Sequence, residues 1–167
     1  MKNKIKAGLL AVCMLAAVFA AGCGGSSDTV SMYDLRTAME AADDTLGEML
    51  SADSNSEDAE DLFAYISDMD YSKVDKFFVS YSNEGSADEI AVIALKNASD
   101  TSDAEKSLKD HVQDRINVFS QYAPEEVKKA ENAITFKDGK YAVLIICDKQ
   151  DEVKKAFTGD YEKKSVN

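Results

Sequence analysis

Cys23 has the clearest chemistry in the sequence, because it directly follows the small residues Ala20, Ala21 and Gly22. A cysteine that follows small residues at the end of an apolar leader is typical of the substrates of bacterial lipoprotein processing. In that reaction the thiol receives a diacylglycerol, and the peptide bond between Gly22 and Cys23 is cleaved. The pattern therefore predicts that Cys23 is lipidated and becomes the first residue of the mature chain.

The leader in front of Cys23 has the layout of an export signal, with lysines at its start and no charge over residues 7–21. An uncleaved transmembrane anchor is the alternative, because an apolar stretch of about 17 residues is the shortest that crosses a bilayer. The lipoprotein pattern usually has Leu three positions before the cysteine, where this chain has Ala20. Two or more acyl chains anchor stably, so we expect attachment to the outer, extracytoplasmic face of the cell membrane.

The charge of the mature chain argues against one class of partner. The chain has 19 basic and 31 acidic residues, and the leader contains only basic ones, three lysines. Cleavage before Cys23 therefore leaves 16 basic and 31 acidic residues, and the formal net charge changes from -12 to -15. Because phosphate backbones require a basic face, no nucleic acid is expected as a partner. The ordinary interpretation is a solvated acidic surface, with a cationic partner as the alternative.

No pattern of nucleophilic or acid–base residues predicts catalysis. His111 is the only histidine, and it lies on the flank of a predicted helix with Asp114 three residues later. This spacing favours a partly exposed histidine beside acidic neighbours over a general base. Cys147 lies in an apolar run and is expected to be a small buried residue without a disulfide partner. The sequence therefore predicts no catalytic residue and no cofactor.

An acidic segment at residues 51–61 invites comparison with calcium loops. From Asp53 onward it places acidic or amide side chains at alternating positions, as an EF-hand loop does. That loop also needs Gly at its sixth position and Glu at its twelfth, where this chain has Asp58 and Ala64. We therefore expect a solvated loop. No metal site is predicted, because one histidine and one apolar cysteine give no zinc-binding spacing.

Hydrophobic spacing predicts the elements that would position these residues. A first helix is expected from Ser31 as its N-cap, with an apolar stripe from Leu35 to Met49. A short apolar segment at 62–66 is expected to be helical or irregular. The composition divides the chain into five parts. They are a leader (1–22), a tether (23–30), an N-terminal helical region with the acidic loop (31–66), an α+β domain (70–159) and a tail (160–167).

The α+β domain is expected to contain two hairpins with helices after them. Strands are predicted at 77–82, 89–96, 134–136 and 141–147, with Asp138-Gly139 as the turn of the second hairpin. Helices are predicted at 102–122, where Ser102 and Glu105 form a capping box, at 125–131, and at 151–157, where Gly159 ends the helix. The order ββ-α-ββ-α favours an α+β fold, a small antiparallel sheet of four strands with helices packed on it in two layers.

Several segments of this domain also carry a family resemblance. They are Ala87–Ile93 at the second strand, Phe119–Glu126 at the end of the long helix, Lys129–Ile134, and Gly139–Tyr141 at the start of the last strand. With these segments, residues 70–157 resemble DUF4358, a family of lipoproteins from clostridia and related Firmicutes whose function is unknown. The resemblance implies a small extracytoplasmic domain behind a lipidated cysteine. It implies no activity, ligand or catalytic residue.

These observations favour a lipid-anchored extracytoplasmic protein that acts as a non-enzymatic binding or interaction module. Its partner would be an envelope protein or an envelope polymer, in addition to the membrane that holds the N-terminal lipid. The first alternative is a cell-envelope hydrolase that uses two carboxylates. A small solute-binding lipoprotein is a further alternative, but the 145 residues after the leader are too few for the usual two-lobed clamp.

Overall fold

The computed structural model describes residues 31–165, so the leader, Gly22, Cys23 and the tether lie outside the described residues. Within these residues one antiparallel sheet has the strand order β1-β2-β3-β5-β4. Its strands are β1 (Met49–Asp53), β2 (Val74–Ser82), β3 (Glu89–Leu95), β4 (Ile134–Asp138) and β5 (Tyr141–Ile146). The α-helices are α1 (Met32–Ala41), α2 (Ala59–Ala64), α3 (Thr101–Tyr122), α4 (Val127–Glu131) and α5 (Gln150–Ser165). The predicted α+β class is confirmed.

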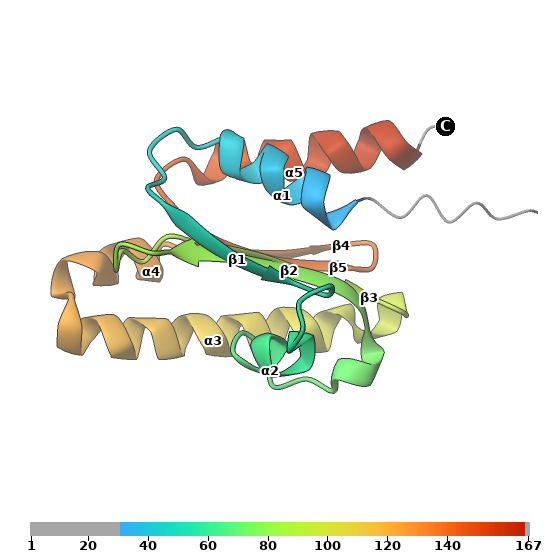
Figure 1. Cartoon of the computed structure of the whole chain (residues 1–167), viewed down its shortest axis with the longest axis horizontal. Coiled ribbons are helices and arrows are strands. Elements are labelled where there is room, and N and C mark those ends of the chain that lie inside the picture. The colour runs from blue at the N-terminus through green and yellow to red at the C-terminus, as the bar shows by residue number, and fades with distance from the viewer. Residues whose placement is uncertain (1–30, 166–167) are drawn as a thin grey trace, which may run out of the picture.

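The helices cover both faces of the sheet, with α1 and α5 on one face and α2 and α3 on the other (Figure 1). Every residue of β3 and of β5 is buried, because these two strands pair in the middle of the sheet. Strands that are apolar on both faces must be covered on both faces. The expectation of two layers is therefore wrong, since the apolar stripe of α1 packs against the face that α3 leaves open.

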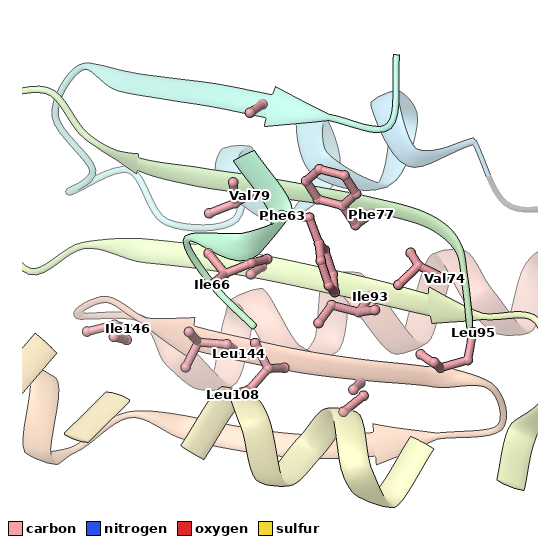
Figure 2. Packing of buried hydrophobic residues seen from close by; sticks show 14 of the residues in the cluster. Phe63, Ile66, Val74, Phe77, Val79, Ile93, Leu95, Leu108, Leu144 and Ile146 are labelled. Atoms are coloured by element: carbon pink, nitrogen blue, oxygen red, sulfur yellow. The ribbon is translucent and has the colours of Figure 1, made fainter. Parts of the chain in front are cut away.

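Each face of the sheet has its own hydrophobic core. On the α1 and α5 face, Leu35, Met39 and Phe157 pack against alternate residues of β3 and β5. On the opposite face, Phe63 and Ile66 from the region of α2 lie over β2 and β3, and Leu108 of α3 lies over β5 (Figure 2). The two cores fix α3 against the sheet, and α3 carries the candidate site described below.

Two hairpins build most of the sheet, as the sequence predicts. β2 pairs with β3, and β4 pairs with β5 through a tight turn in which Gly139 has φ of 54°. A positive φ is accessible to Gly without the steric strain that other residues incur. The N-cap of α1 is also confirmed, because the hydroxyl of Ser31 accepts a hydrogen bond from the backbone N–H of Asp34 at 3.3 Å.

The strand β1 was not expected from the sequence. The first helix ends at Ala41, although its apolar stripe continues to Met49, and the chain then pairs antiparallel with β2 from Met49 to Asp53. The predicted N-terminal helical region therefore includes an edge strand, and the sheet has five strands instead of four. Hydrogen bonding to the open edge of β2 outweighs the helical spacing, and Gly47 between the two elements is a poor helix residue.

Two predicted helix ends also differ. α3 begins at Thr101, and the hydroxyl of Ser102 accepts a hydrogen bond from Lys137 of β4 at 2.6 Å in place of forming the capping box. α5 continues through Gly159 to Ser165. Gly159 is not among the described glycines with positive φ, so it lacks the left-handed conformation that ends a helix.

Candidate functional site

Glu89 is a carboxylate in a position that the strand pattern reserves for an apolar side chain. It begins β3 and shares the α3 face of the sheet with Ala91 and Ile93, which are core residues. Its neighbours across the sheet are Tyr81 and Ile146, and only 1% of its surface is exposed. A charge buried this deeply is tolerated only where it has partners of opposite charge or hydrogen-bond donors.

Two side chains of α3 supply those partners. The Nε2 of His111 lies 2.6 Å from the Oε1 of Glu89, and the Nε of Arg115 lies 3.1 Å from Oε2. His111 and Arg115 are four residues apart and therefore project from the same side of the helix. The Nε of Arg115 and the Oε2 of Glu89 form an ion pair, but their geometry is not that of a hydrogen bond. The guanidinium also lies over the ring of Phe119, 4.6 Å from its centroid.

The sequence-based prediction for His111 is wrong. His111 is 9% exposed, and its partner is the buried Glu89 on the sheet, whereas a partly exposed ring beside acidic neighbours of its own helix was expected. Helical spacing relates residues of one helix only, so it could not identify a partner 22 positions earlier in the chain. The available signal was the strand alternation, which assigns Glu89 to the same face as Ala91 and Ile93.

The contacts of His111 determine what it offers to a ligand. An ionised carboxylate only accepts hydrogen bonds, so Nε2 carries the proton that points at Glu89. Arg115 also supplies one positive charge to this carboxylate. In the neutral form of the ring, Nδ1 is then an acceptor. No hydrogen bond joins Nδ1 to another residue in the part of the chain that the structure describes.

His111 lines a cleft of about 150 Å³ between α3 and the segment that follows α2. Tyr65 stands at this cleft with 66% of its surface exposed, and its ring meets the His111 ring edge-on at 6.2 Å. Asp68, Asp110 and Asp114 add three carboxylates to the walls. We call this feature, defined by His111, Tyr65 and the three aspartates, the His111 cleft.

Two serines in the His111 cleft raise the question of a nucleophile. The Ser107 hydroxyl donates to Asp68 Oδ1 at 2.7 Å, and it accepts from the backbone N–H of Asp68 at 3.1 Å. Ser67 Oγ lies 2.8 Å from Ser107 Oγ, so its own proton is directed at Ser107. Both hydroxyl protons are therefore engaged, and neither points at His111. A serine–histidine–glutamate arrangement for acyl transfer is not formed.

A second buried carboxylate, Asp43, lies near the opposite face of the sheet. Its Oδ1 accepts hydrogen bonds from the backbone N–H of Thr45 at 2.9 Å and from the Thr45 hydroxyl at 2.5 Å. Its Oδ2 accepts one from the backbone N–H of Lys149 at 2.9 Å. Burial by itself raises the pKa of Asp43, but these hydrogen bonds and one from Cys147 outweigh it and lower the pKa from 3.8 to about 2. Burial, followed by the hydrogen bond and charge of Asp43, raises the pKa of Cys147 to about 12. Cys147 is buried, as predicted.

Neither a metal centre nor a membrane span is found in the part of the chain that the structure describes. No three histidine, cysteine or acidic side chains within residues 31–159 converge closely enough to hold a metal ion. None of the helices in this part of the chain combines the length and the apolar character that crossing a bilayer needs. The acidic segment that was compared with calcium loops forms hydrogen bonds of its own, since Asp53 Oδ1 accepts from the backbone N–H of Asn55 at 2.7 Å.

The sequence matches one known protein family. The profile of DUF4358, a domain of unknown function, matches residues 34–147. The chain belongs to the DUF4358 family. The match begins well before residue 70, where the resemblance was expected to start, and it includes most of α1, all of β1 and the three residues Glu89, His111 and Arg115. No curated protein and no solved structure matches the chain.

Proposed function

We propose that this DUF4358 protein is a lipid-anchored, extracytoplasmic binding module that takes its ligand at the His111 cleft. The lipid anchor rests on the Ala20-Ala21-Gly22-Cys23 pattern behind a basic, then apolar, leader. Seven residues, 24–30, separate the acylated cysteine from Ser31, the N-cap of α1. Such a tether spans about 28 Å at most when fully extended, so the domain stays close to the membrane surface.

One observation carries the binding role: a side chain that is nine-tenths buried presents an unengaged ring nitrogen to a cleft. Glu89 fixes the ring of His111 through Nε2, and Arg115 balances the charge of Glu89. A buried group held in one orientation by a hydrogen bond is preorganised, and preorganisation reduces the entropic cost of binding. The exposed ring of Tyr65 beside it provides a contact surface for a ligand.

The hydrolase alternative has less support from the His111 cleft. Its serine protons are engaged with Asp68 and Ser107, which leaves no activated hydroxyl beside His111. A hydrolase that uses two carboxylates needs one of them held in its protonated form by an apolar environment. Asp110 and Asp114 are exposed to solvent, and Asp110 pairs with Lys106 at 2.5 Å. We therefore retain binding as the proposed function.

The anchor is tested by fractionating cells that express Cys23→Ser and by measuring the intact mass of the protein. We expect the unmodified chain to be found in membranes with the added mass of a diacylglycerol and without residues 1–22. The variant should lose this mass and should accumulate as precursor or as released protein. Unchanged mass and unchanged membrane retention in Cys23→Ser would refute the lipid anchor.

The binding role is tested by NMR of the full chain in nanodiscs, titrated with cell-envelope extract that is separated into small molecules, polymers and proteins. Shifts clustered at Tyr65 and His111, and lost in Tyr65→Ala, are expected from one fraction. Tyr33→Ala is the matched control, because Tyr33 is 63% exposed but lies on α1. The bound compound should be recovered chemically unchanged. A new product that forms with the unmodified chain but not with His111→Gln would favour an enzyme instead.

A further inference from the structure

We propose that the His111 cleft binds the protonated amino group of an alkylamine, either a free diamine or a lysine side chain. This inference rests on the proposed function, because it names the ligand chemistry of the same site. It follows from the carboxylates that line the cleft, which only accept hydrogen bonds, and from the aromatic ring at its edge.

The first step concerns hydrogen-bonding capacity. With Nε2 donating to Glu89, the Nδ1 of the neutral His111 ring has only a lone pair to offer. The carboxylates of Asp68 and Asp114 also only accept, and the hydroxyl protons of Ser67 and Ser107 are already engaged. A ligand that fits these side chains must supply donors. An alkylammonium group supplies three N–H donors and has no acceptor.

The second step concerns charge. Asp68, Asp110 and Asp114 contribute three negative charges to the walls, and the Lys106 ammonium beside Asp110 offsets one of them. No ion pair joins Asp114 to another side chain within residues 31–159. The charge of Glu89 is balanced by Arg115 and therefore does not add to this total. The cleft thus favours a cation, and an anionic or phosphorylated ligand would be repelled.

The third step separates an organic cation from a metal ion. The acidic groups lie along the walls without converging on one point, and no three of the described metal-ligating side chains form a coordination shell. The exposed ring of Tyr65 suits an alkylammonium, because aromatic faces attract cations and also cover methylene groups. A volume of about 150 Å³ accommodates the end of an alkyl chain but not a large solute.

The test is a titration of the full chain in nanodiscs with n-butylammonium chloride, followed by ¹⁵N and ¹H NMR. We expect saturable shifts at Tyr65 and a shift of the His111 Nδ1 resonance as this atom accepts a hydrogen bond. Tyr65→Ala should weaken binding by roughly two- to fivefold, the range expected for a cation over an exposed ring. Asp114→Asn should weaken it as well, and added salt should do the same. n-Butanol, which has no charge, should produce no saturable shift.

Matched controls locate the effect. Tyr33→Ala removes an equally exposed ring from α1, and Asp151→Asn removes an exposed carboxylate from α5, on the opposite face of the sheet. Neither should change the affinity. Equal shifts with n-butanol, no change of affinity in Tyr65→Ala and Asp114→Asn, or no shift of His111 Nδ1 would each overturn the inference.

Two further arms distinguish the sources of the amine and separate this inference from the proposed function. Tighter binding of 1,5-diaminopentane than of Nα-acetyl-lysine amide indicates a free diamine, and the reverse order indicates a lysine of a partner protein. If the envelope fractions contain a ligand that shifts Tyr65 and His111 but carries no amine, the proposed function stands and the alkylamine inference is wrong. If amines shift the resonances but the amine is consumed, binding without catalysis is wrong.

Discussion

The two carboxylates buried most deeply by their surroundings, Asp43 and Glu89, are held in different ways. The hydrogen bonds to Asp43 come from two backbone N–H groups, the Thr45 hydroxyl and the Cys147 thiol, none of which carries a charge. Glu89 instead contacts His111 and Arg115, which both belong to one helix beside a cleft. The first arrangement joins the end of α1 to the chain after β5. The second orients a side chain that a ligand can reach.

A structural acid and an acid that supports a site therefore differ in what their hydrogen-bond partners can still bind. The backbone and hydroxyl donors around Asp43 are used by its own carboxylate. We therefore assign Asp43 a structural role only. Around Glu89 one contact leads on to an unengaged atom, Nδ1 of His111. A buried charge can therefore support a binding site when one of its partners still has a donor or acceptor atom free for a ligand.

The largest expected effect tests the Asp43 region through the reactivity of Cys147. Burial and Asp43 raise the pKa of this thiol from 9.0 to about 12, so its thiolate fraction at pH 8 falls about a thousandfold. Alkylation by iodoacetamide, followed by mass spectrometry, should be slower by at least this factor in the folded chain than in urea. Equal rates in both conditions would show that the thiol is not held by its surroundings.

The next effect concerns Glu89→Gln, which leaves Arg115 buried against a neutral side chain. Removing one member of a buried ion pair costs about 3 kcal/mol, because the remaining charge loses its compensation. Urea unfolding followed by circular dichroism measures this loss at pH 7. The double variant Glu89→Leu with Arg115→Leu should recover much of the stability, since it removes both charges. A smaller loss of stability for Glu89→Gln than for Asp43→Asn would contradict the distinction between the two acids.

A smaller effect is expected for Asp43→Asn, which turns one of two accepting oxygens into a donor. The folded pKa of Asp43 is lowered to about 2 from 3.8, so the ionised group contributes about 2 kcal/mol above pH 3.8. This contribution is lost as the pH falls from 3.8 through 2, where the folded state also takes up the proton. The difference in unfolding free energy between the unmodified chain and the variant should shrink over that range. A difference that does not depend on pH would contradict the assignment.

The smallest effect is expected for Tyr65→Ala. Because Tyr65 is 66% exposed, its removal should change the free energy of unfolding by less than about 0.5 kcal/mol. The same urea titration measures it, with Tyr33→Ala as the comparison. If Tyr65→Ala weakens ligand binding without changing the free energy of unfolding, the Glu89 region contains separate structural and binding residues. A loss of several kcal/mol would place Tyr65 in the core instead.

The sequence predicts the helices, strands and turns that are determined by residues close together in the chain. Ser31 caps α1 as expected, Gly139 makes the turn of the second hairpin, and the apolar run of β3 is central in the sheet. The strand β1 and the continuation of α5 through Gly159 are missed. Both depend on tertiary packing, since β1 forms on the open edge of β2 and α5 packs against α1.

The candidate site is less predictable than the fold, for the same physical reason. Each of its three central residues looks ordinary in its own segment: Glu89 follows another acid at the start of a strand, and His111 and Arg115 lie among charged helix residues. Their meaning comes from the packing of α3 over the first residue of β3, a contact between segments far apart in the chain. The acylation pattern at Cys23 remains a prediction from sequence alone.

The pairing of β3 with β5 has a consequence for how the chain reaches this structure. Each hairpin closes locally, but the seam between them joins residues 89–94 to 141–146 across the whole of α3 and α4. Hairpins form in about 1–10 μs, whereas contacts between distant segments must first overcome the entropy of closing a long loop. Docking of the two hairpins is therefore the expected rate-limiting event. Shortening a side chain where β3 pairs with β5, as in Val143→Ala, should slow folding. An exposed substitution away from these two strands should leave the folding rate unaltered.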